Sequence, residues 1–264
     1  LGHTAFGHAG QDALNECMAP YGGFEHNLQS LRVVDRLEER YPQFDGLNLS
    51  FETREGILKH CSHSHAEAIE ALEPGGVARR FLDRTQPSLE AQLCNLADAI
   101  AYNAHDIDDG VRSGLLSLEQ MQAVPLFDHY RQQSLAEHPE LQGKPRRWLY
   151  ESTRRMLSDQ VYDVIDTTRA AIAAAGIANA DEARLAGPLL RFSEPMKTRS
   201  TELKRFLFAS LYRHPQVTQM MDQAQQVVRE LFAAYLAQPG EMRAEFAARA
   251  DRERAVADYI AGMT

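Results

Sequence analysis

Apolar residues recur at three- and four-residue spacing along almost all of the 264 residues, and no other feature limits the possible folds so strongly. The spacing predicts helices over 29–41, 52–60, 88–109, 117–136, 147–175, 189–213, 216–237 and 241–261. Segments that alternate apolar and polar residues, as a half-buried strand does, are short and few. The sequence therefore predicts an all-α protein.

Residues 137–146 are the most linker-like part of the chain, because they are polar and contain two prolines. We expect this linker to separate residues 1–136, the core, from residues 147–264. The second part is expected to be helical, to pack on the core and to complete its pocket. One continuous helical body is the alternative.

The charge and the cysteines limit the kinds of partner and the compartment. A net charge of −9 argues against a surface that mainly coats nucleic acid, so a polyanionic substrate would need a local basic pocket. No stretch approaches the roughly 20 apolar residues that span a bilayer, and we expect no membrane partner. Three cysteines without a C-x-x-C pair suit a reducing compartment, so we expect a cytoplasmic protein.

The N-terminal segment places His3 and His8 among three glycines. Glycine has no side chain, so the backbone can approach a ligand closely there. A simple turn is the alternative. The segment begins at Leu1 without an initiator methionine, and we expect the chain to be an interior piece of a longer protein.

Residues 95–110 predict an amphipathic helix whose polar face is strongly acidic. At about 100° per residue, this face carries Asp98, Tyr102, His105, Asp106 and Asp109. Three carboxylates and a histidine without a lysine would repel one another unless a cation or hydrogen-bond donors lay among them. A solvated helix face is the alternative.

Residues 202–214 predict a helix that combines basic and aromatic side chains. Lys204 and Tyr212 are eight residues apart, which is about two α-helical turns. The alternative is a buried helix whose Lys204 and Arg205 only reach outward to water.

Together these phrases resemble the deoxyguanosine triphosphate triphosphohydrolase-like proteins, a branch of the HD-domain phosphohydrolases. Members typically read His-Asp-Leu-Gly-His-x-x-Phe-Gly-His-x-Gly-Glu and then Gly-Gly-Phe-Glu-x-Asn-x-Gln, which this chain matches over residues 1–10 and 22–29. The helices of Asp98 and Lys204 and the closing residues 257–264 match further family phrases. The resemblance implies an HD-domain-like multi-helix bundle, with residues 1–136 as a phosphohydrolase core that lacks its N-terminal part. The His-Asp dyad of the superfamily would lie immediately before Leu1.

The activity that the resemblance implies is hydrolysis of a deoxynucleoside triphosphate (dNTP) to deoxynucleoside and inorganic triphosphate. The family holds a divalent metal, Mg²⁺, Mn²⁺ or a similar ion, with two His and two Asp, and of these only Asp98 is present. We therefore expect metal only with the upstream ligands, and an inactive protein without them. His8 is the implied catalytic residue near the α-phosphate, and Gln11 replaces the Glu that assists it in relatives. Gln can orient the imidazole by hydrogen bonding but carries no charge to raise its basicity.

The resemblance also implies how substrate is held. His3, His26 and Asn27 are implied to contact the substrate, and Lys204 to meet the triphosphate. More distant animal dNTP triphosphohydrolases suggest that Tyr102 lies against the nucleotide and that Asp106 binds the sugar 3′-hydroxyl. Tyr212 is implied to pack on the deoxyribose, where a ribose 2′-hydroxyl would collide with it.

The same resemblance implies a homo-oligomer, and a dNTP or single-stranded DNA as a possible effector. Two other functions remain open. One is an HD-fold phosphohydrolase that acts on other nucleotides, and the other is a non-catalytic regulator that binds dNTPs or single-stranded DNA. The products that form from each dNTP distinguish these functions.

Overall fold

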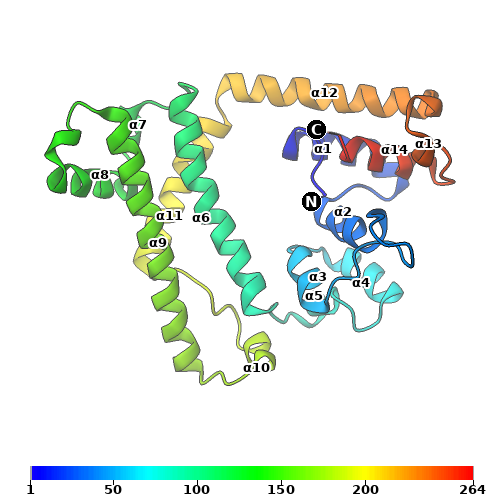
Figure 1. Ribbon diagram of the computed structural model, residues 1–264, viewed down its shortest axis with the longest axis horizontal. Helices are drawn as coiled ribbons and strands as arrows, with labels where there is room; N and C mark the ends of the chain where they lie inside the picture. The colour runs from blue at the N-terminus through cyan, green and yellow to red at the C-terminus, as the bar shows by residue number, and fades with distance from the viewer. Residues whose placement is uncertain (1, 264) are drawn as a thin grey trace. The chain divides into compact units, whose positions relative to one another are not determined.

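The structure is a computed structural model that describes residues 2–263. Over these residues it contains 14 α-helices and five short 3₁₀ or π segments, and the only extended pairings are two isolated β-bridges. The all-α fold class is therefore confirmed. The chain forms two compact units, the first from Leu1–Arg84 with Thr218–Thr264 and the second from Thr85–Val217 (Figure 1).

The first unit combines the N-terminal helices with the C-terminal ones. Its elements are α1 (Gly7–Met18), η1 (Ala19–Tyr21), α2 (His26–Arg32), η2 (Val33–Leu37), α3 (Phe51–Ile57), α4 (His63–Leu72), α5 (Arg79–Asp83), most of α12 (Pro215–Ala237), η5 (Pro239–Glu241), α13 (Ala244–Ala247) and α14 (Arg252–Ala261). Leu14, Phe232 and Ile260 belong to one apolar cluster that joins α1, α12 and α14. Leu31 and Ala66 belong to a second cluster, between α2 and α4. The two ends of the chain thus share one core.

The second unit is built around four long helices. Its elements are α6 (Leu89–Arg112), α7 (Leu118–Gln122), α8 (Pro125–Glu137), η3 (Pro139–Leu141), α9 (Pro145–Ala175), α10 (Ala180–Leu185), α11 (Glu194–Leu207) and η4 (Phe208–Tyr212). Ile107, Phe127, Met156 and Leu203 come from α6, α8, α9 and α11, and meet in one buried cluster. The expected linker 137–146 lies within this unit, where it joins α8 to α9, and these two helices pack together.

Side-chain caps fix where the helices that carry predicted site residues begin. The side chains of Glu25, Ser88 and Ser193 each accept a hydrogen bond from a backbone N–H in the first turn of α2, α6 and α11, respectively. Such a cap satisfies a donor that the helix itself leaves open.

Several element boundaries differ from the prediction. The glycine-rich start of the chain forms helix α1, which the periodicity did not indicate, because its apolar face is short and interrupted by Gly10. The segment predicted as one helix over 189–213 is α11 followed by a π-helix, η4. The segment predicted over 241–261 is divided where Asp251 caps α14. None of the helices in residues 2–263 combines the length and apolar character needed to cross a bilayer.

Candidate active site

Three of the predicted site residues form a cluster of imidazole rings in the first unit. The rings of His3 and His26 stack with centroids 4.3 Å apart and planes 22° apart. His8, on α1, meets both rings edge-on, at 5.1 Å from His3 and 6.0 Å from His26. The segment before α1 and the start of α2 thus bring together side chains that are 23 residues apart in sequence.

Glycine is required where this segment approaches α2. A Cβ at Gly2 would overlap with the carbonyl oxygen of His26 and the backbone nitrogen of Ser30, and the residue has a φ of +70°. Only glycine adopts such a backbone conformation readily. The sequence suggested that these glycines would let backbone approach a ligand, but here Gly2 lets it approach α2.

Two rings of the cluster, those of His3 and His26, favour the uncharged form. Burial lowers the pKa of His3 most, and the charges of His26 and His8 lower it further. Burial also lowers the pKa of His26, against the carboxylate of Glu25, which raises it. An uncharged imidazole can accept a proton from water or a hydrogen bond from a ligand.

Glu25 and Asn27 are hydrogen-bonded to each other at the start of α2. Asn27, another predicted site residue, is buried, and its Nδ2 donates to Oε1 of Glu25 at 2.8 Å. Sequence reasoning treated Glu25 only as part of a family phrase, and its role as the N-cap of α2 was missed. An acidic residue just before a predicted helix was the signal that could have indicated it.

Gln11 and Glu25 line a cavity of 510 Å³ that also contains three guanidinium groups, those of Arg32, Arg36 and Arg254. Arg254 donates to the carbonyl oxygen of Gly23 at 2.9 Å. Arg36 is exposed and makes no ion pair with the residues that the structure describes. The cavity is therefore a local basic pocket within an acidic chain, although Glu25 and Asp251 also line it.

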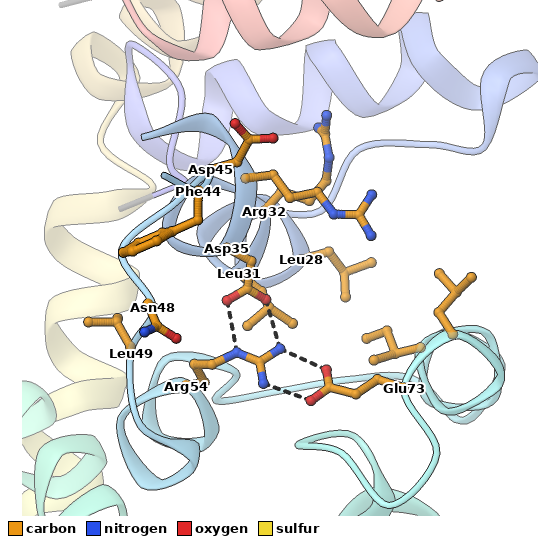
Figure 2. A pocket seen from close by; sticks show the side chains of 13 residues that line it. Leu28, Leu31, Arg32, Asp35, Phe44, Asp45, Asn48, Leu49, Arg54 and Glu73 are labelled. Carbon is orange, nitrogen blue, oxygen red and sulfur yellow. Dashed lines mark hydrogen bonds and ion pairs between the residues drawn. The ribbon is translucent and has the colours of Figure 1, made fainter. Parts of the chain in front are cut away.

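A second cavity, of 800 Å³, shares Arg32, Arg36 and Leu28 with the first one. At its edge the Arg54 guanidinium lies between two carboxylates and binds both oxygens of Asp35 and of Glu73 at 2.7–2.8 Å (Figure 2). These hydrogen bonds lower the pKa of Glu73. Because every carboxylate oxygen is already engaged, this ion triplet serves to join η2, α3 and the residue that follows α4.

Three other predicted site residues meet in the second unit. Tyr212 donates a 2.6 Å hydrogen bond from its hydroxyl to Oδ2 of Asp106, on α6. The Tyr102 ring stacks on the Tyr212 ring with centroids 6.3 Å apart and planes 8° apart. Burial raises the pKa of Asp106, and the hydrogen bond from Tyr212 partly opposes that rise. Burial and this carboxylate also raise the pKa of the Tyr212 hydroxyl.

The π-helix η4 determines where Tyr212 points. Its defining hydrogen bond runs from the Arg213 N–H to the carbonyl oxygen of Phe208, five residues earlier, at 3.2 Å. A π turn holds more residues than an α turn, so Tyr212 is not two α-helical turns beyond Lys204 as the spacing suggested. Lys204 is exposed on α11.

Asp98, the predicted metal ligand, is exposed on α6. Over the described range 2–263, no group of three or more His, Cys, Asp and Glu side chains is arranged to hold a metal ion. In the histidine cluster, the rings of His3 and His26 turn their faces to each other. These residues alone therefore do not fit a divalent metal, and Asp98 stays a predicted ligand.

Asp258 connects the C-terminal helix to α2 and was not among the predicted site residues. Its carboxylate is buried and accepts hydrogen bonds from Arg32 at 2.7 and 3.0 Å, from Gln29 at 2.9 Å and from Arg249 at 3.1 Å. Arg32 and Gln29 are 226 and 229 residues away in sequence, so no local pattern could have indicated the contact. The closing segment therefore supports the helix that begins with His26 and Asn27.

Known proteins resemble the chain over its whole length. Residues 190–264 match the model of the phosphohydrolase-associated domain. Three relatives are each named deoxyguanosinetriphosphate triphosphohydrolase-like protein, and each alignment covers 100% of this chain. The protein of Ralstonia nicotianae is 56% identical with 67% of its length covered, that of Thiobacillus denitrificans 54% with 69%, and that of Nitrosomonas europaea 48% with 69%. At this identity and coverage, the chain belongs to the family of deoxyguanosinetriphosphate triphosphohydrolase-like proteins.

Proposed function

We propose that this protein hydrolyses a deoxynucleoside triphosphate, dGTP or another dNTP, to the deoxynucleoside and inorganic triphosphate. In this reaction water adds to the α-phosphorus, the bond from that phosphorus to the 5′-oxygen breaks, and the 5′-oxygen takes a proton. One observation carries the proposal: within the first unit, the imidazole rings of His3, His8 and His26 lie together, with ring centroids 4.3–6.0 Å apart.

The histidine cluster would work at the phosphates. His8 is exposed on α1 beside His3 and His26, whose pKa values are lowered, so uncharged imidazoles are available at neutral pH. An uncharged imidazole at the α-phosphate can take the proton of the attacking water or accept a hydrogen bond from it. Lowered pKa values among grouped side chains favour a functional site over a solvated surface.

The pair of Tyr212 and Asp106 would hold the sugar. The hydroxyl of Tyr212 is tied to Asp106 at 2.6 Å, so its ring is fixed in orientation. Tyr102 is about half exposed and supplies a flat apolar face parallel to that ring. A fixed ring against C2′ would exclude a ribose hydroxyl by contact, which favours deoxynucleotides.

The basic pocket supports a polyanionic substrate. The guanidinium of Arg36 forms no ion pair with any of residues 2–263. Arg36 lines the same cavity as Gln11. Guanidinium groups bind phosphate oxygens in pairs of hydrogen bonds. A net charge of −9 makes a concentration of arginines in one cavity a specific feature of the chain.

The test is to identify the products from each dNTP. The protein is assayed with Mn²⁺, with Mg²⁺ and with chelator, both as this chain and extended upstream to include the His-Asp dyad. We expect inorganic triphosphate from the extended form, dependent on metal, and none from the short form. Release of orthophosphate would instead support a different phosphohydrolase, and binding without turnover would support a regulator. His8→Ala should abolish the activity, whereas the exposed His138→Ala should retain it.

A further inference from the structure

The carboxylate of Glu25 makes three contacts at the start of α2. Oε2 accepts the backbone N–H of Leu28 at 3.0 Å, and Oε1 accepts Nδ2 of Asn27 at 2.8 Å. Oε1 also lies 2.9 Å from Nδ1 of His26. One side chain thus contacts both substrate-binding residues that the sequence predicts on this helix.

Two of these contacts fix the carboxylate in place. The bond from Leu28 anchors Oε2 to the first turn of α2, and the bond from the buried amide of Asn27 anchors Oε1. An amide held through its nitrogen must direct its carbonyl oxygen elsewhere, because the two atoms lie on opposite sides of the group. Glu25 therefore sets the orientation of Asn27.

The contact with His26 acts mainly through charge. Nδ1 of His26 is buried and has no hydrogen bond of regular geometry, even though Oε1 lies only 2.9 Å away. Adjacent residues in a helical turn cannot usually align such a bond, but they can hold a charge beside a ring. The proton on the ring is therefore stabilised by proximity to the carboxylate.

Imidazole rings and one ammonium group face His26 from the other elements. His3 precedes α1 and stacks on the ring, and His8 on α1 meets it edge-on. Lys59 and His60, in the segment after α3, also lower the pKa of His26. Among the influences on His26, the carboxylate of Glu25 is the one that opposes burial and the effects of His8, His60 and Lys59.

We propose that Glu25 is a positioning residue of the active site, which orients the amide of Asn27 and holds a negative charge against the His26 imidazole so that the histidine cluster keeps its geometry and protonation. Its effect on turnover rests on the proposed function, whereas its effect on His26 does not. Glu25 itself is not assigned a contact with substrate.

The test compares Glu25→Gln with Glu25→Ala and with a matched control, Glu16→Gln, in the extended form of the protein. Gln keeps an acceptor for the Leu28 N–H but loses the charge, whereas Ala loses both. Glu16 is an exposed residue on α1 whose carboxylate pairs with Arg229, so its replacement removes the same charge away from the cluster. The titration of each histidine ring is followed by NMR, and kcat and KM for dGTP are measured across pH.

We expect the Glu25→Gln variant to fold normally. The substitution should lower the pKa of His26 and shift the acidic limb of the kcat/KM profile to lower pH. At neutral pH, kcat/KM should fall about tenfold, because a mispositioned acid–base group loses part of a typical 10²–10⁴-fold contribution. Glu16→Gln should change neither. An unchanged titration of His26 in Glu25→Gln would overturn the proposal, whatever the activity. If His26 shifts but wild type releases no triphosphate, the positioning stands and the proposed function fails.

Discussion

Asp258 offers a direct test of how the C-terminal helix supports α2. Asp258→Asn keeps the shape of the side chain but replaces one acceptor oxygen with an amide nitrogen. The four hydrogen bonds to the carboxylate come from one buried amide and from two guanidinium groups that are each about one third exposed (32%). Removing one partner of a buried ion pair costs about 3–5 kcal/mol, and the exposure of the arginines places this case at the lower end.

We therefore expect the free energy of unfolding of the first unit to fall by about 3 kcal/mol. For a unit of this size the unfolding midpoint should fall by about 10 °C. Urea and thermal unfolding followed by circular dichroism measure both quantities. Asp222→Asn, at an exposed position on α12, is the control and should stay within about 0.5 kcal/mol of wild type. A loss of less than 1 kcal/mol in Asp258→Asn would refute the view that this carboxylate holds α14 to α2.

Three further predictions concern single side chains. Gln160→Leu should stabilise the second unit by about 1–2 kcal/mol in urea unfolding, because the amide of Gln160 is buried without a hydrogen-bond partner among the described residues. Gln92→Leu is the control. It removes an amide that is hydrogen-bonded to Pro87 and Leu189, so it should destabilise the same unit. Asp106 keeps its proton to higher pH when folded than when unfolded, so its contribution to stability is lost as pH rises above about 4. Asp106→Asn should therefore gain stability relative to wild type between pH 3 and pH 7, and a constant difference would contradict the burial argument. Arg36→Ala should raise KM for dGTP about tenfold with kcat little changed, whereas Arg40→Ala, which removes an exposed partner of Glu38, should leave KM unchanged.

The sequence was sufficient for the fold class and for the main helices. Helices α6, α9 and α12 begin and end within a few residues of the predicted limits, because each has a long apolar stripe and a clear cap or proline at its start. The stripe was less reliable for single positions. In α6 the apolar side chain of Leu93 is 48% exposed, whereas the polar Asn103 is buried.

The candidate site was only partly predictable. The resemblance indicated His3, His8 and His26. The close contact of Gly2 with α2 brings the His3 ring to the His26 ring. That contact depends on backbone geometry, which the spacing of apolar residues does not encode. The contact of Asp258 with α2 could not have been found, because Gln29 and Arg32 are more than two hundred residues away. Contacts of that kind are set by tertiary packing and leave no local pattern.

The π turn at η4 makes the direction of the Tyr212 ring depend on one turn of backbone hydrogen bonding more than on side-chain chemistry. If this stretch kept all its residues but continued as an ordinary α-helix, the residues beyond it would rotate by about 100° about the helix axis. Tyr212 would then swing away from Asp106 even though every side chain of the pair was retained. Substitutions that convert this π turn into a regular α turn should thus turn Tyr212 away, even where they do not touch the pair itself.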